Sequence, residues 1–316
     1  EYRFPPTAVY TGQEVLFRFK LTSGRINSAE LRIVTDNTEL SYPMEKSGSY
    51  YQVRVHAPTR TGAFHYYILL RSQGENMYIC PDVTGFTGVV RKERTEGFRF
   101  VVYLKDFETP AWFRKSVMYQ IFPDRFARSD DDTARKGIDY HRSLGQTPDY
   151  HESVDEPVKY QPRPGEKEYS PDDFYGGTLK GIESRLDYLA DLGITCVYLN
   201  PIVEARSNHR YDASNYLNVD PILGTVEDFE HLCKKAEEKG IRFILDGVYS
   251  HTGADSIYFN RYGNYPTIGA CQGRQSPYYS WYTFKHFPED YQSWWGFKDL
   301  PEVNELDTEW QELVIS

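Results

Sequence analysis

The segment Ile241–Gly253, with the sequence IRFILDGVYSHTG, constrains the fold of this chain more than any other stretch. Its apolar residues stop at a carboxylate, Asp246, and a hydroxyl and an imidazole follow at Ser250 and His251. An apolar run closed by polar groups is typical of a buried parallel strand. Because α/β folds place their chemistry at the carboxyl ends of such strands, Asp246 and His251 are candidate site residues. On this stretch alone, a loop-capping aspartate and a surface histidine fit equally well.

The chain repeats this pattern at two earlier places. Ser116–Phe122 and Ile194–Leu199 are predicted strands, and Thr178–Leu192 and Thr225–Lys239 are predicted helices that glycines follow directly. Thr178 suits the N-cap of the first helix. The inward face of the second helix is expected to consist of Val226, Phe229, Leu232, Cys233 and Ala236. Alternation of strand and helix with short turns is typical of a parallel sheet.

Residues 1–108 show a different pattern, in which short alternating strands are separated by Gly, Pro, Ser, Asn and Asp. The expected strands are Val15–Phe19, Ala29–Val34, Tyr50–Val55, Phe64–Leu70 and Phe98–Leu104. This pattern predicts an antiparallel β-sandwich, which ends near Thr109-Pro110. Such a domain either binds glycans or serves packing and dimerisation, and the structural role is favoured because no exposed aromatic platform is evident.

Two segments are expected to be irregular. Residues 130–173 are polar and rich in Pro and Gly, which predicts a long loop. Residues 252–304 lack a strong helix or strand pattern and are expected to lie over the mouth of the predicted parallel fold. Aromatic residues are frequent there and either form a core of their own or stack on sugar rings. They are Tyr278, Tyr279, Trp281, Tyr282, Phe284, Phe287, Tyr291, Trp294, Trp295 and Phe297. An amphipathic helix is expected from Asp307 onward.

Composition excludes some classes of function. A net charge of −10 argues against binding to nucleic acid or to an anionic membrane surface. The 27 Tyr residues favour sugar rings or a large protein interface. The four cysteines have no CxxC spacing, and Cys196 and Cys233 are expected to be buried as small hydrophobes. No disulfide framework or membrane span is expected. We expect a cytoplasmic location and leave secretion open.

Five sequence blocks occur in order between Val117 and Asn304: VMYQIFPDRF, FYGGTLKGIESRLDYLADLGITCVYLNPI, SNHRYDASNYLNVDPILGT, ILDGVYSHTG and SWWGFKDLPEVN. Together they closely resemble the α-amylase family of retaining glycoside hydrolases, and within it the neopullulanase and cyclomaltodextrinase branch. The resemblance implies a (β/α)8 TIM barrel that follows a β-sandwich and carries a domain B insertion after the third strand.

This resemblance assigns a domain to each part of the chain. Residues 1–108 match the antiparallel β-sandwich, and residues 109–251 match the first three β/α units of the barrel. Residues 252–304 match domain B, and residues 305–316 begin the following helix. The chain therefore resembles the N-terminal portion of such an enzyme, with an incomplete barrel.

The resemblance also implies roles for individual residues. Asp246 matches the aspartate that orders an arginine beside the nucleophile, and His251 matches the histidine that binds a hydroxyl of the sugar in the cleaved subsite. Tyr211 matches the tyrosine that stacks beneath this sugar, and His209 and Arg210 lie in the same loop with less defined roles. Packing alone is the competing interpretation of each of these residues.

Asn304 closes the domain B block, whose composition separates the branches of the family. The residues before it, Glu302 and Val303, depart from the usual sequence of this branch. The preference between α-1,4 and α-1,6 bonds therefore stays open.

Retaining glycosidases need two carboxyl groups about 5–5.5 Å apart, as nucleophile and acid/base. In this family they come from the fourth and fifth strands, so no catalytic residue is expected in this chain. A barrel takes roughly 250 residues, which three β/α units do not supply. We expect residues 1–316 alone to be inactive, and to aggregate or remain molten in the barrel half.

The expected function of the full-length protein is hydrolysis of α-glucosidic bonds in maltooligosaccharides, starch, pullulan or cyclodextrins, by double displacement. The alternative is a catalytically silent, amylase-like subunit that binds carbohydrate or protein. The presence of Tyr211 and His251 favours the hydrolase over the silent subunit, because a scaffold has no need of residues that position a sugar. Expected partners are the α-glucan, the remainder of the barrel, and a second copy bound through the N-terminal domain.

Many members of the family bind calcium in the loop after the first strand, through oxygen ligands. In this chain the corresponding segment begins with Arg128, and Thr178 stands where an acidic residue is expected after the two glycines. A cationic side chain at a ligand position opposes a divalent ion. We therefore expect no metal and no cofactor.

Overall fold

The computed structural model describes residues 2–35, 38–165 and 169–315. They form two compact units, Glu1–Pro110 (unit 1) and Ala111–Ser316 (unit 2). Within these described ranges, no helix is both long and apolar enough to cross a membrane.

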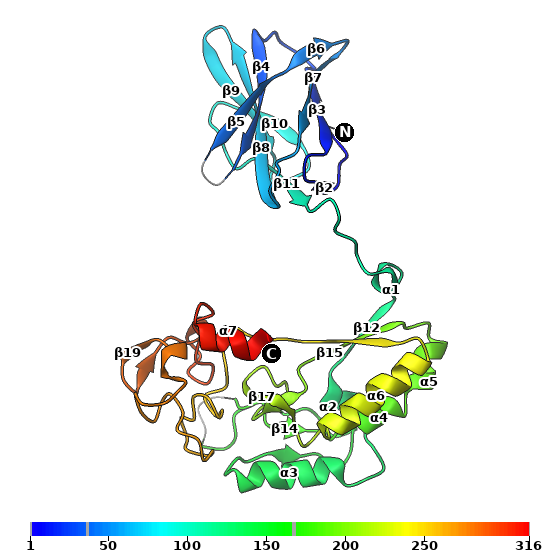
Figure 1. The fold of residues 1–316 in the computed structure, drawn as a ribbon, viewed down its shortest axis with the longest axis vertical. Helices are drawn as coiled ribbons and strands as arrows, with labels where there is room; N and C mark the ends of the chain where they lie inside the picture. Colours follow the sequence, from blue (N-terminus) through cyan, green and yellow to red (C-terminus); the bar gives the residue numbers. More distant parts are fainter. Residues whose placement is uncertain (1, 36–37, 166–168, 316) are drawn as a thin grey trace. The chain divides into compact units, whose positions relative to one another are not determined.

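Unit 1 consists of two β-sheets (Figure 1). The first has the order β1 (Arg3–Phe4), β3 (Glu14–Lys20), β7 (Tyr50–His56), β6 (Glu45–Ser47). The second has the order β10 (Gly88–Arg91), β9 (Glu75–Pro81), β8 (Gly62–Ser72), β11 (Phe98–Tyr103), β2 (Val9–Tyr10). In the same sheet, β4 (Ser28–Val34) pairs with β8, and β5 (Glu39–Pro43) pairs with β4. The strands pair antiparallel, apart from the parallel pair β11–β2.

Alternation of apolar and polar residues explains how these sheets pack. In β3 the side chains of Val15, Phe17 and Phe19 are buried, whereas the residues between them are partly exposed. They share one apolar core with residues of the second sheet. The ring of Phe17 meets that of Tyr66 edge-on at 4.7 Å, which joins the two sheets. The five predicted strands occur as β3, β4, β7, β8 and β11.

Unit 2 contains a parallel sheet of β12 (Met118–Ile121), β15 (Cys196–Leu199) and β18 (Arg242–Leu245), in that order. Met118, Cys196 and Arg242 lie in register, so all three strands point the same way, as the sequence predicts. The middle strand is almost entirely buried, whereas the outer two are partly exposed.

Helices pack on this sheet through apolar side chains. They are α4 (Leu179–Glu183), α5 (Leu186–Asp191) and α6 (Val226–Glu238), and Figure 1 shows them on one side of unit 2, away from β19 and α7. Buried leucines and isoleucines of the sheet and the helices form one core. The short helices α1 (Ala111–Arg114) and α2 (Pro123–Phe126) precede and follow β12.

Two details of the predicted helices are wrong. The predicted helix Thr178–Leu192 is divided into α4 and α5 by residues 184 and 185, although Thr178 does cap it through Oγ1, which accepts from Gly181 N at 2.9 Å. In α6, Val226 is 42% exposed rather than inward, because it occupies the first helical position, beyond the packed turns. Leu232 and Ala236 are fully buried, as expected, whereas Cys233, which was also expected to be buried, is only half-buried.

The predicted long loop over residues 130–173 is also wrong in part. It contains the helix α3 (Thr133–Ser143), whose buried residues Ala134, Ile138 and His141 share one face. It also contains β13 (Asp149–Tyr150), which pairs with β14 (Asp173–Phe174). A further hairpin that the sequence did not indicate, β16 (Val203–Ala205) and β17 (Ala213–Val219), lies between β15 and α6.

Residues 252–304 contain only short elements: η1 (Tyr279–Trp281), β19 (Phe284–His286), β20 (Asp290–Tyr291) and η2 (Trp294–Gly296). The helix α7 (Thr308–Ile315) follows them. Part of the aromatic set forms the core of this region, as the first alternative expected, with Trp281, Tyr282 and Tyr291 buried beside Trp310 of α7. Other aromatic rings remain at its surface, among them Trp295 and Phe297.

Candidate functional site

The loop between β16 and β17 is anchored by a buried ion pair. Arg210 is fully buried and adopts a left-handed backbone, with φ of 61°. Its Nε donates to Asp220 Oδ2 at 2.9 Å, and the Asp220 carboxylate also lies 3.2 Å from His141 Nε2. Burial alone raises the pKa of Asp220, but the charges of Arg210 and His141 outweigh it and lower the value to about 2. Arg210 therefore fixes the loop and does not face the site.

The side chain of His209 binds the backbone of Tyr211. Its Nδ1 accepts from Tyr211 N at 3.0 Å and lies 3.0 Å from Ser207 Oγ. Burial lowers the pKa of His209, so the imidazole is neutral and can accept at this nitrogen. The result is a fixed position for Tyr211 at the tip of the loop.

Tyr211 meets the carboxyl ends of two strands. Its hydroxyl donates to Asp246 Oδ2 at 2.8 Å and accepts from Asn200 Nδ2 at 3.2 Å. Asn200 directly follows β15 and Asp246 directly follows β18, and these strands are neighbours in the sheet. Burial and the nearby Asp246 carboxylate raise the pKa of Tyr211 to about 12, so the phenol stays protonated and remains a donor.

His251 lies in the turn after β18 and is only 4% exposed. Its Nδ1 lies 3.0 Å from Ser250 Oγ, and its ring packs on that of Trp294 with centroids 5.3 Å apart. Among the residues that the structure describes, Nε2 has no hydrogen-bond partner. Burial lowers the pKa of His251, although the Tyr211 backbone and the charge of Asp212 act against it. A neutral, buried imidazole therefore lies against the backbone of Tyr211.

Asn304 takes part in none of these side-chain contacts among the described residues. Its side chain is exposed, and Oδ1 accepts from Leu306 N at 3.2 Å in the turn before α7. Its backbone nitrogen donates to Trp281 O at 2.7 Å. The contacts of Asn304 are those of a turn residue, and its role in substrate binding stays a prediction. Asn200, which sequence reasoning did not select, has the same signal as Asp246: a polar residue directly after a buried strand.

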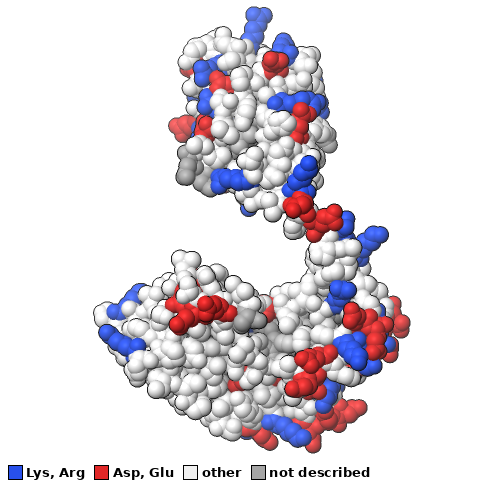
Figure 2. Space-filling model, in the orientation of Figure 1, with Lys and Arg blue, Asp and Glu red and all other residues white. Residues whose placement is uncertain are grey.

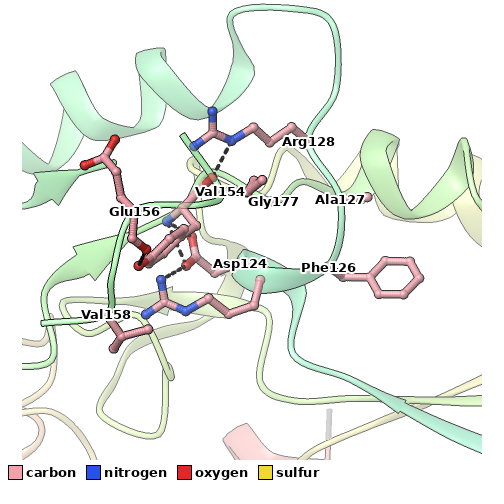
Figure 3. Close-up of a pocket in the computed structure, with 10 residues that line it drawn as sticks. Asp124, Phe126, Ala127, Arg128, Val154, Glu156, Val158 and Gly177 are labelled. Atoms are coloured by element: carbon pink, nitrogen blue, oxygen red, sulfur yellow. Dashed lines mark hydrogen bonds and ion pairs between the residues drawn. The ribbon is translucent and has the colours of Figure 1, made fainter. Parts of the chain in front are cut away.

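The loop after β12 borders a cavity of about 230 Å³ (Figure 3). Asp124 is buried beside it and accepts from Tyr175 N at 3.0 Å and from Gly176 N at 3.1 Å. Figure 3 shows Arg128 reaching toward Val154 and Gly177, whereas the ring of Phe126 points away. Burial raises the pKa of Asp124, because the charge of Arg210 and the hydrogen bonds from the Tyr175 and Gly176 backbone offset it only partly.

Two cationic side chains lie at the segment considered for calcium, Arg128 within it and Lys180 on α4. Arg128 donates to three backbone oxygens, those of Tyr175 at 2.6 Å, Glu152 at 2.6 Å and His151 at 2.5 Å. Lys180 Nζ lies 2.9 Å from Asp131 Oδ2, so it pairs with a carboxylate of the same segment. Arg128 and Lys180 thus place two positive charges at this segment, and Lys180 already pairs with the Asp131 carboxylate, so these residues oppose a divalent cation.

Tyr211, Asp246 and His251, which lie at the carboxyl ends of the parallel strands, indicate what kind of ligand this part of unit 2 can bind. A phenol, a carboxylate and a neutral imidazole with an unused nitrogen offer donors and acceptors that match sugar hydroxyls. On the face of unit 2 drawn in Figure 2, charged side chains gather over the side of α4–α6, and the middle of this face carries few. A parallel β/α sheet with polar groups at the carboxyl ends of its strands is the arrangement of β/α-barrel enzymes.

Comparison with known proteins identifies the family to which the chain belongs. Residues 120–309 match the model of the α-amylase catalytic domain. The chain belongs to the α-amylase family, which confirms the family expected from its sequence blocks. It is 38% identical over 309 residues to an amylopullulanase of Thermoanaerobacterium saccharolyticum, covering 89% of this chain and 24% of that protein. It is 34% identical over 255 residues to a cyclomaltodextrinase of Geobacillus thermopakistaniensis, covering 78% of this chain and 37% of that protein.

A solved structure shares the fold. The type III pullulan hydrolase from Thermococcus kodakarensis matches with a TM-score of 0.58 and 26% identity, over 98% of this chain and 51% of that protein. The chain spans only 16–24% of the amylopullulanases that it matches. The activity and substrates of the whole protein are therefore matters of proposal.

Proposed function

We propose that this chain forms the substrate-positioning part of an enzyme that hydrolyses α-glucosidic bonds in α-glucans. The observation that carries the proposal is the contact between Tyr211 and Asp246 at 2.8 Å, next to the buried imidazole of His251. The tyrosine ring offers a flat face to a sugar, and Nε2 of His251 offers a bond to one of its hydroxyls. Relatives named amylopullulanase, cyclomaltodextrinase and neopullulanase support α-glucans as the substrate class.

The proposed reaction is a double displacement with retention of the anomeric configuration. The nucleophile and the acid/base are proposed to be carboxylates outside residues 1–316, on strands that follow β18 in the family fold. In this scheme Asp246 orients the positive group beside the nucleophile, and Tyr211 and His251 hold the sugar ring. Residues 1–316 alone are then expected to show no turnover.

The test uses the full-length protein that carries this chain. Maltooligosaccharides, pullulan and cyclodextrin are supplied separately, and the anomeric configuration of the first product is read by NMR. Products in the α-configuration support the proposal, and the substrate panel assigns the bond preference. Binding of maltooligosaccharide without turnover indicates instead the catalytically silent relative. Products in the β-configuration, or turnover by purified residues 1–316, contradict the proposed mechanism.

A further inference from the structure

Three aromatic rings form a cluster at the surface of unit 2, and one of them, Trp294, packs on His251. The rings of Trp294 and Trp295 are parallel within 7°, with centroids 4.9 Å apart. The ring of Phe297 lies 6.3 Å from that of Trp294. Trp295 is 84% exposed and Phe297 is 58% exposed. We call these three residues the aromatic platform.

Trp295 has two features that cost the folded state free energy. Its indole is almost fully exposed to water, and its backbone has φ of 50°, in the left-handed region that bulky residues rarely adopt. Local backbone bonds hold this geometry, because Trp294 N donates to Leu300 O at 2.9 Å and Leu300 N donates to Phe297 O at 3.0 Å. Strain that a fold maintains at an exposed aromatic residue is typical of a functional surface.

The platform is continuous with the sugar site. The ring of Trp294 packs on that of His251, with centroids 5.3 Å apart. The strand-like segment after the platform pairs with the turn that carries His251, since Thr252 N donates to Pro301 O at 3.1 Å. The ring of Trp294 therefore contacts both the imidazole of His251 and the ring of Trp295.

We propose that the aromatic platform is a second binding subsite, which stacks a further glucosyl unit of the α-glucan held at Tyr211. This inference rests on the proposed function. The flat, uncharged ring of Trp295 suits the apolar C–H face of a pyranose, and its rigid backbone keeps the cost of ordering low. The subsite makes the protein select longer substrates over short ones.

The experiment measures the full-length protein with maltotriose and with maltoheptaose. In the Trp295→Ala variant, KM for maltoheptaose is expected to rise about tenfold, which corresponds to the loss of one aromatic stacking contact. KM for maltotriose is expected to change less than twofold. Trp295→Phe retains a flat ring and is expected to recover most of the affinity. Tyr188→Ala, at another exposed aromatic residue on α5, is the matched control and leaves both constants unchanged.

Each outcome decides the inference. Equal effects of Trp295→Ala on both substrates, or no effect on either, overturn it. A large fall in the unfolding temperature of Trp295→Ala also overturns it, since the ring is then covered by the protein's own chain. If the wild type binds α-glucans without cleaving them, the hydrolase assignment fails separately, and calorimetric affinities for maltotriose and maltoheptaose then decide the platform in the same way.

Discussion

The hydroxyl of Tyr211 lies 2.8 Å from Oδ2 of Asp246, although 35 positions separate these residues in the chain. The bond joins the loop of the β16–β17 hairpin to the carboxyl end of β18. Asn200 donates to the same hydroxyl from the end of β15. The position of the tyrosine ring is thus fixed by two neighbouring strands of the parallel sheet.

Loss of this bond is expected to weaken catalysis without unfolding the protein. In full-length Tyr211→Phe, kcat/KM on a maltooligosaccharide should fall about tenfold or more, because a hydrogen bond to a charged group contributes about 1.5–3 kcal/mol. Asp246→Asn and the double variant complete a mutant cycle. Because the two side chains act together, the double variant should lose less than the sum of the two single losses. Strictly additive losses would show that the bond does not contribute.

His251 predicts a pH dependence on the acid side. Its burial lowers the pKa below the ordinary value of 6.5, so the unfolded chain takes up a proton before the folded chain does. Above pH 6.5 both states are neutral at this group; as the pH falls below 6.5 toward the lower folded-state pKa, stability is lost. His251→Gln should therefore reduce the fall in unfolding temperature between pH 7 and pH 5, compared with the wild type.

His56 supplies the control substitution, because its side chain is exposed and its Nδ1 lies 3.1 Å from a backbone oxygen, Gly12 O. His56→Gln controls for the exchange of histidine for glutamine itself. Identical profiles for the wild type and His251→Gln would refute a neutral, buried imidazole at position 251.

Arg128 is expected to be a main stabilising residue of unit 2. Arg128→Ala removes donors from three backbone oxygens, and the free energy of unfolding should fall by about 3 kcal/mol. The matched control is Arg135→Ala, which breaks an exposed ion pair with Glu152 and should change the stability by less than about 1 kcal/mol. Denaturant unfolding of the full-length variants measures both. Equal losses in the two variants would contradict the role of Arg128.

The same segment predicts indifference to calcium. Hydrogen bonds from Ser129, Lys180 and Thr133 satisfy the Asp131 carboxylate, and they hold its pKa well below its usual range. EDTA followed by excess Ca²⁺ should leave the unfolding temperature of the full-length protein unchanged. A rise with Ca²⁺ that Asp131→Asn abolishes would show that this segment binds the ion after all.

Much of the fold was predictable from local patterns. The strands of the parallel sheet follow from short apolar runs closed by polar residues, and Thr178 and Thr225 mark the helix starts through their caps. The pairing of Tyr211 with Asp246 was foreseeable only from the resemblance to the family, since nothing local connects the two positions.

Other features depend on tertiary contacts that a single sequence does not show. The helix α3 escaped detection because Gly137 weakens its helical pattern. This glycine allows a close approach, since a Cβ there would lie 2.3 Å from the Cα of Ile222. The contacts of Arg128 with distant carbonyl groups, and the exposure of Trp295, likewise arise only once the loops are packed.

The most direct test of the account compares kcat/KM of full-length Tyr211→Ala and of the control Tyr188→Ala on maltoheptaose. Loss of the ring beneath the sugar, together with its bond to Asp246, should lower kcat/KM about 100-fold, or about 2.7 kcal/mol. Tyr188→Ala should match the wild type. A folded Tyr211→Ala variant with activity within twofold of the wild type would contradict the assignment of this site to α-glucan binding.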